Sequence, residues 1–125
     1  MNEMLIKTNL GRISIAFGAS EAIRLEDGTT DLPVIYLHGV FLDKTLWTAV
    51  NSPAQGRMQV FVDMPAHGNS DNVGHDWSLN DCVDMLIGVM DQLTVQRCVV
   101  IGHSWGSMTA LRAAAQFPDR FAALG

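Results

Sequence analysis

The sequence predicts an α/β fold, a mostly parallel sheet with helices on both faces. Three short apolar runs, Val34–Leu37, Gln59–Val62 and Cys98–Ile101, are typical of strands buried on both sides. The segments between and after these runs carry helical patterns. Because strands that alternate with helices form parallel sheets, we expect one α/β domain.

The N-terminal part of the chain is predicted to add two further strands. Met4–Thr8 and Arg12–Phe17 are rich in β-prone residues, and Asn9-Leu10-Gly11 between them suits a tight turn. Residues 18–32 are polar and are predicted as a loop, with a short strand around Ala22–Leu25 as an option.

Helices are expected after each of the three apolar runs. Asp43 can cap a short helix after the first run. Ser78 is a good N-cap for a longer helix with a 3.6-residue apolar period, and Asp81 places negative charge near its positive end. An alanine-rich helix over 107–117 follows the third run, and Pro118 ends it. Met85, Met90 and Met108 are predicted as core residues.

Composition excludes several classes of protein. The 125 residues are 48% hydrophobic and 17% charged, which disfavours disorder. Thirteen acidic and eight basic residues give a formal net charge of −5, without the cationic clusters that nucleic acids or acidic membranes require. The apolar runs are too short to span a membrane, and the N-terminus lacks a secretory signal.

The two cysteines, Cys82 and Cys98, lie in apolar stretches without the spacing of a metal site or a disulfide framework. Free buried thiols suit a reducing compartment. We therefore expect a cytoplasmic protein without a metal or another cofactor.

The strongest motif is Gly102-His103-Ser104-Trp105-Gly106, a G-x-S-x-G pentapeptide between the third apolar run and the alanine-rich helix. A nucleophilic serine must lie on a sharp strand-to-helix turn, and flanking glycines remove Cβ atoms that would clash there. The N-terminus of the following helix favours negative charge that develops near the serine.

Two further motifs follow the first and second apolar runs. These are His38-Gly39-Val40-Phe41 and the segment from Asp63 to Ser70, which reads D-M-P-A-H-G-N-S. With these three ordered motifs, the chain resembles the N-terminal half of an α/β-hydrolase of the serine hydrolase type over about 34–117. The resemblance implies a single partial domain over 1–125, truncated after the helix of the nucleophile elbow. Ala66, where the family more often has glycine, implies a local loop adjustment.

The resemblance implies a role for each motif residue. Ser104 is the nucleophile, and the backbone N–H groups of Trp105 and Val40 form the oxyanion hole, with Phe41 as a less favoured donor. Trp105 and Phe41 either line an acyl pocket or have ordinary packing roles. The remaining motif residues with structural roles are His38, Gly39, Gly102 and Gly106.

A serine at the elbow, rather than an aspartate, favours acyl chemistry over dehalogenation or epoxide hydrolysis. The implied substrate is a small apolar ester, thioester, lactone, amide or activated C–C bond. The histidines of this chain are not expected to act as the base. His38, His67 and His103 are predicted as loop or packing residues, and His75 as solvated.

The triad of this fold follows the chain order serine, acid, histidine. The 21 residues after Ser104 contain no histidine, and their only acid, Asp119, lies beyond a helix of about 11 residues, roughly 16 Å away. We therefore expect the front half of a hydrolase, inactive by itself. The alternative is a non-catalytic domain that binds a small apolar ligand or a partner chain.

The strand before Ser104 is expected to have an open edge, since the family places its next neighbour near Phe121. An apolar strand with unpaired backbone groups is a template for pairing with another chain. This predicts self-association of the 125-residue polypeptide.

Overall fold

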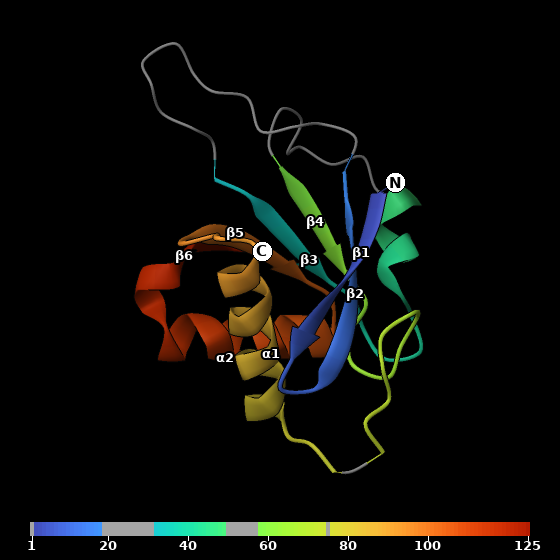
Figure 1. Ribbon diagram of the computed structural model, residues 1–125. Helices are drawn as coiled ribbons and strands as arrows, with labels where there is room; N and C mark the ends of the chain where they lie inside the picture. The colour runs from blue at the N-terminus through green and yellow to red at the C-terminus, as the bar shows by residue number, and fades with distance from the viewer. Residues whose placement is uncertain (1, 19–31, 50–57, 75) are drawn as a thin grey trace.

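The computed structural model describes residues 2–18, 32–49, 58–74 and 76–125, which form a six-stranded sheet with helices packed against it (Figure 1). The optional strand at Ala22–Leu25 and His75 lie outside the described residues. The strands are β1 (Asn2–Thr8), β2 (Gly11–Phe17), β3 (Val34–Leu37), β4 (Gln59–Val62), β5 (Cys98–Gly102) and β6 (Phe121–Leu124). The α-helices are α1 (Leu79–Gln92) and α2 (Trp105–Gln116), and the 3₁₀ helices are η1 (Lys44–Ala49) and η2 (Pro118–Arg120).

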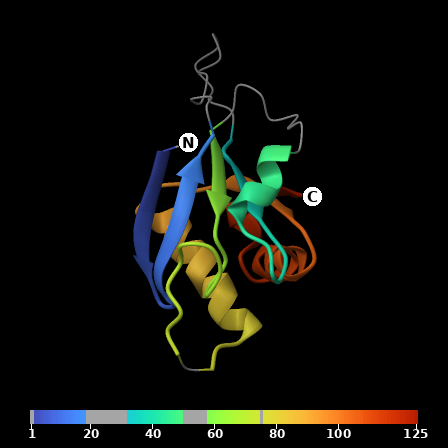
Figure 2. The same ribbon diagram turned by 90° about the vertical axis from the view of Figure 1, so that its right-hand side faces the viewer.

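The sheet has the strand order β1-β2-β4-β3-β5-β6. Strands β3, β4, β5 and β6 are parallel, while β2 pairs antiparallel with both β1 and β4. Figure 2 shows the β1–β2 hairpin in blue at one edge of the sheet. The predicted α/β class and mostly parallel sheet are therefore confirmed.

The two faces of the sheet are covered differently. Helices α1 and α2 pack against each other and against the larger core, to which β3 contributes Ile35 and Leu37. The alternate residues of β3 point to the other face, where Tyr36 packs with Phe61 and with Trp47 of η1. Both α-helices thus share one face, and the 3₁₀ helix η1 covers part of the other.

The predicted caps are present. Ser78 and Asp81 form a reciprocal capping box at the start of α1, with the Asp81 N–H donating to the Ser78 hydroxyl at 3.2 Å. Asp43 accepts the N–H of Thr45 at 2.8 Å, so that it caps η1. Helix α2 begins at Trp105, two residues before the predicted start, because the turn at Ser104 leads directly into it.

Strand β6 corrects the expectation of an open edge on β5. Cys98 pairs with Phe121, and the pairing continues through Val100. The Gly102 N–H then donates to the Gly125 carbonyl at 3.0 Å. The outer strand on this side of the described sheet is therefore β6, not β5.

The register brings three loops to one edge of the sheet. Leu37, the last residue of β3, lies opposite both Val62 of β4 and Gly102 of β5. Because the three strands are parallel, the segments after them meet at this edge, and they carry the three sequence motifs. Asp119 precedes β6, whose first residue pairs with the first residue of β5, so it lies toward the opposite edge.

Candidate active site

Ser104 lies at a strained, exposed turn. Its backbone has φ 54° and ψ −112°, a combination that is sparsely populated for a residue with a side chain. Strain of this kind persists where surrounding structure enforces it, most often at functional sites. Ser104 is the N-cap of α2, and its side chain makes no capping hydrogen bond.

Close backbone contacts leave no room for a side chain at either glycine of the pentapeptide. A Cβ atom on Gly102 would lie 2.5 Å from the backbone carbon of Gly106. A Cβ atom on Gly106 would lie 2.1 Å from the carbonyl oxygen of Leu37. The first glycine lets the turn close on itself, and the second lets α2 approach the end of β3.

The loop after β3 packs directly against this turn. A Cβ atom on Gly39 would lie 2.8 Å from His103 Nδ1 and 3.2 Å from Ser104 Cβ. The His103 N–H donates to the Leu37 carbonyl at 3.0 Å. Gly39 is therefore the residue that brings this loop, including Val40, beside Ser104.

The backbone N–H groups of the loop after β3 and of the turn at Ser104 differ in whether they have a hydrogen-bond acceptor. The Phe41 N–H donates to His67 Nε2 at 3.1 Å. Within the described part of the chain, no residue accepts a hydrogen bond from the N–H of Val40 or Trp105. The N–H groups of Val40 and Trp105, which sequence analysis assigns to the oxyanion hole, thus have no acceptor among the described residues, whereas the N–H of Phe41 has one.

The histidines at this edge bind backbone groups. Buried His38 accepts the Met64 N–H at Nε2 (2.8 Å) and bonds the Gly39 carbonyl through Nδ1 (2.7 Å). His67 contacts the Pro65 carbonyl through Nδ1 at 2.9 Å. Burial lowers the pKa of His38, although the bond to the Gly39 carbonyl opposes this shift.

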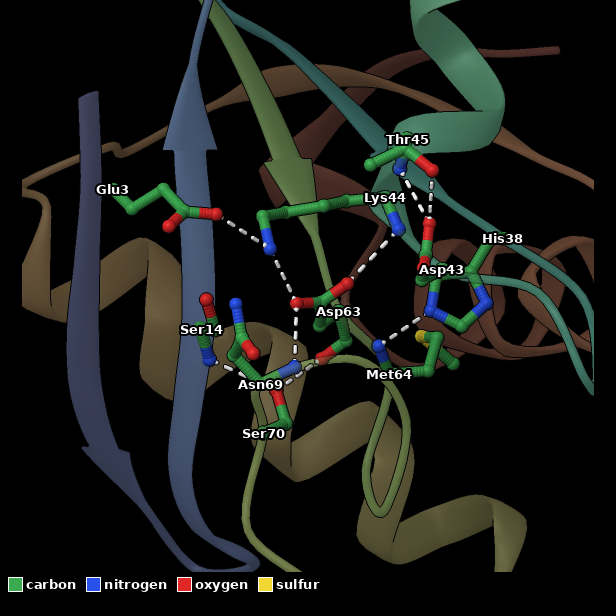
Figure 3. A network of polar contacts seen from close by, with 10 residues as sticks. All are labelled: Glu3, Ser14, His38, Asp43, Lys44, Thr45, Asp63, Met64, Asn69 and Ser70. Carbon is green, nitrogen blue, oxygen red and sulfur yellow. Dashed lines mark hydrogen bonds and ion pairs between the residues drawn. The ribbon is translucent and has the colours of Figure 1, made fainter. Parts of the chain in front are cut away.

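A buried ion pair lies beside these loops, as Figure 3 shows. Lys44 Nζ is 2.5 Å from Asp63 Oδ2, and these side chains are 5% and 0% exposed. Lys44 also contacts Glu3 of β1 at 2.8 Å. Burial lowers the pKa of Lys44, but the hydrogen bonds to Asp63 and Glu3 outweigh it, so that the pKa is raised. Sequence analysis did not single out Lys44.

Asp63 also organises the loop that follows it. Its carboxylate accepts the N–H of Lys44 at 2.9 Å and that of Asn69 at 3.0 Å. Gly68 has φ +52°, and a Cβ atom there would lie 2.3 Å from Asp63 Cγ. Ala66 adopts φ 64°, a left-handed conformation that glycine takes with less strain.

Ser104 opens onto a cavity of about 450 Å³. Trp77 stacks on Trp105 with ring centroids 5.5 Å apart, and His67 lies 5.1 Å from the Trp105 ring. Met108, predicted as a core residue, is 59% exposed and lines this cavity, so that prediction is wrong, while Met85 and Met90 are buried. The lining comprises Val40, His67, Trp77, Ser104, Trp105 and Met108.

Sequence analysis missed Trp77, because no spacing relates it to the motifs. It lies just before Ser78, the N-cap of α1, and reaches Trp105 through the packing of α1 against α2. Tertiary structure positions this ring. The signal in the sequence that could have pointed to Trp77 is its place as an aromatic residue just before a helix N-cap.

The cysteines remain outside this site. Burial raises the pKa of Cys82 to about 11, against a smaller opposing effect of a hydrogen bond from Trp105, and burial raises that of Cys98 to about 12. Both thiols are therefore protonated and poorly nucleophilic at neutral pH. Among the described residues, no three His, Cys, Asp or Glu side chains gather as a metal site, and no helix has the length and apolarity to cross a membrane.

Comparisons with known proteins point to one family. A sequence model of the family described as alpha/beta hydrolase fold matches residues 33–124. The sn-1-specific diacylglycerol lipase ABHD11 of Mus musculus is 36% identical over 99 residues, which cover 76% of this chain and 32% of the lipase. A haloalkane dehalogenase of Psychrobacter cryohalolentis is 30% identical over 105 residues, covering 78% of this chain and 34% of the dehalogenase.

A thermophilic esterase from Thermogutta terrifontis has a similar structure, with a TM-score of 0.78 and 26% sequence identity. The match covers 99% of this chain and 44% of the esterase chain. The chain thus spans less than half the length of these relatives. The part that the family model matches contains the loop after β3, the loop after β4 and the turn at Ser104.

Proposed function

Because this chain belongs to the alpha/beta hydrolase fold family, we propose that it carries the nucleophile and oxyanion-binding half of a serine hydrolase. The observation that carries the proposal is the exposed, left-handed Ser104 at the N-terminus of α2, with Gly39 packed against its Cβ. A nucleophilic serine requires this exposure and sharp backbone turn.

In the proposed reaction, Ser104 Oγ attacks the carbonyl carbon of the substrate, and the carbonyl electrons move to its oxygen. The free N–H groups of Val40 and Trp105 bind this oxyanion, supported by the positive end of α2. Collapse of the tetrahedral intermediate expels the leaving group and leaves an acyl-enzyme, which water then hydrolyses.

The proposed substrates are small apolar esters, thioesters, lactones, amides or activated C–C bonds. The cavity beside Ser104, lined by Trp77, Trp105 and Met108, suits an apolar acyl group. A lipase and an esterase among the relatives support ester chemistry. The dehalogenase among them shares the family, but a serine at position 104 favours acyl transfer over its named reaction.

The serine proton needs a base from outside the described residues. His38 and His67 use both ring nitrogens for backbone contacts, and His103 lies over Gly39. This favours a second candidate function, a domain with the same fold that binds a small apolar ligand without catalysis.

A fluorophosphonate probe distinguishes these functions. In the full-length polypeptide that carries this sequence, we expect covalent labelling of Ser104, located by peptide mass spectrometry and lost in Ser104→Ala. Ser107→Ala, which changes another exposed serine of α2, is the matched control and should retain labelling. Labelling that persists in Ser104→Ala would exclude the nucleophile role, and ligand binding without labelling would support the second candidate.

Residues 1–125 alone should be a poor catalyst. Without a base the serine hydroxyl remains protonated and weakly nucleophilic. We expect hydrolysis of p-nitrophenyl esters no faster than the roughly 10³–10⁴-fold enhancement that remains when triad members are lost. A faster rate that disappears in Ser104→Ala would show that a histidine of this chain or of a second copy supplies the base.

A further inference from the structure

Two histidines join the loops after β3 and β4 in opposite directions. His38, in the first loop, accepts the Met64 N–H of the second at 2.8 Å. His67, in the second loop, accepts the Phe41 N–H of the first at 3.1 Å. Since a backbone N–H can only donate, each Nε2 must be unprotonated, and each neutral ring then carries its proton on Nδ1. We call this reciprocal pair the histidine clasp.

The residue that His67 holds is strained. Phe41 has φ 65°, an outlier for a bulky side chain. Its side chain is 94% exposed, so that packing does little to hold this conformation. Two described hydrogen bonds restrain it: the Phe41 N–H donates to His67 Nε2 at 3.1 Å, and the Leu42 N–H donates to the Gly39 carbonyl at 3.3 Å across the turn that contains Phe41.

This restraint acts on the donor next to it. Val40 directly precedes Phe41, and its N–H is free of acceptors among the described residues. Rotation of the Phe41 backbone toward an unstrained conformation would also reorient the loop that presents the Val40 N–H. His67 lines the same cavity as Ser104 and packs beside Trp105, the other free donor.

We propose that His67 is a positioning residue of the oxyanion hole, which holds Phe41 in its left-handed conformation so that the Val40 N–H faces Ser104. The clasp works only while His67 is neutral, because a proton on Nε2 would meet the Phe41 N–H. The inference rests on the proposed hydrolase function and assigns this role to a residue outside the catalytic triad.

His67 differs from its partner in accessibility. His38 is fully buried, whereas His67 is part exposed. A substitution at His67 therefore disturbs the core less than one at His38, and it tests the His67–Phe41 bond by itself.

The test compares His67→Gln with His67→Asn, two neutral amides that differ by one methylene. The glutamine amide reaches the position of Nε2 and can still accept the Phe41 N–H. The asparagine amide reaches only the position of Nδ1, so that it keeps the contact with the Pro65 carbonyl and loses Phe41. The first readout is the rate of fluorophosphonate labelling of Ser104 in the full-length polypeptide.

We expect His67→Asn to label Ser104 more slowly than His67→Gln, by up to the 10²–10³-fold seen when an oxyanion donor is removed elsewhere. His67→Gln should label Ser104 at close to the wild-type rate, because its amide oxygen still accepts the Phe41 N–H. The rates are compared at equal folded fraction, so that a folding defect of His67→Asn does not enter the comparison. Equal rates in the two variants would overturn the proposal.

A second readout needs no activity. In residues 1–125, ¹⁵N NMR should find the neutral His67 ring with its proton on Nδ1, and the Phe41 amide resonance should shift more in His67→Asn than in His67→Gln. A wild-type protein that shows this clasp but no labelling would overturn the hydrolase function and the oxyanion role with it. Normal labelling, with a Phe41 amide resonance unaffected by His67→Asn, would overturn the inference alone.

Discussion

At the scale of single residues, the site depends on polar groups that burial would penalise if they lacked partners. His38 and Asp63 have no exposed surface, and each binds backbone N–H groups of the loops around Ser104. A buried group of this kind costs free energy when its partner is removed or when its charge changes. Stability measurements on these residues therefore report on the geometry of the loops.

His38 should make stability depend on pH. Burial lowers its pKa in the folded protein below the ordinary 6.5. At low pH the unfolded chain binds a proton at His38 that the folded protein does not bind. The free energy of unfolding is therefore unaffected by His38 well above about pH 6.5 and decreases progressively below it. Urea unfolding between pH 7.5 and pH 5 should show this decline, with a shallower slope in His38→Gln. An equal slope in both proteins would contradict the assignment.

Lys44 should contribute more to the free energy of unfolding than Glu3, its half-exposed partner. Lys44→Met leaves the buried carboxylate of Asp63 without its cation, which costs about 3–5 kcal/mol in comparable buried pairs. Glu3→Gln removes only the half-exposed partner, and the expected cost is below about 1 kcal/mol. Denaturant unfolding of both variants gives the comparison. Equal small losses would show that the pair is solvated in solution.

At the scale of elements, the position of α2 depends on a backbone contact that leaves no room for a side chain. Gly106 lies in its first turn, against the carbonyl of Leu37 at the end of β3. Gly88 lies in α1, where a Cβ atom would meet its nearest neighbour, Thr8, at 3.8 Å. The same substitution in these two helices therefore separates packing from helix propensity.

Gly106→Ala should destabilise the protein by about 1–3 kcal/mol or more, since α2 must move away from β3. Gly88→Ala should stabilise it by about 0.5–1 kcal/mol, because alanine is the better helix former and the space is open. Thermal and urea unfolding measure both effects. A neutral Gly106→Ala would mean that α2 can shift at little cost, and Ser104 would then lack a fixed position.

At the scale of the whole molecule, three parallel strands deliver three motif-bearing loops to one edge of the sheet. Protection of the outer strands of the sheet is less complete. Most of β6 is exposed, and its residues Ala122, Ala123 and Leu124 are apolar. An apolar outer strand offers its unpaired backbone groups to another chain.

The 125-residue polypeptide should therefore self-associate through β6 rather than through β5, as first expected. Leu124→Lys places a charge on this strand and should shift the population toward monomer. Size-exclusion chromatography with light scattering at micromolar concentration measures the state of both proteins. A stable wild-type monomer would refute this prediction, and dimers unaffected by Leu124→Lys would place the interface elsewhere.

The sequence by itself determined the elements that depend on neighbouring residues. Apolar runs located β3, β4 and β5, the N-cap residue Ser78 located the start of α1, and the G-x-S-x-G pattern located the turn at Ser104. These signals are local, because strand burial, helix caps and sharp turns are decided within a few residues along the chain. The family resemblance came from the order of such motifs.

Only the tertiary structure decided which distant residues meet. Lys44 binds Asp63, which lies 19 positions away in the sequence, and the Phe41 N–H donates to His67, which lies 26 positions away. The exposure of Met108 was likewise not predicted, and the pairing of β6 with β5 closed an edge that was expected to be open. Each depends on strand order and on the angle at which loops approach one another, and no local pattern encodes either, because many distant partners satisfy the same local preferences.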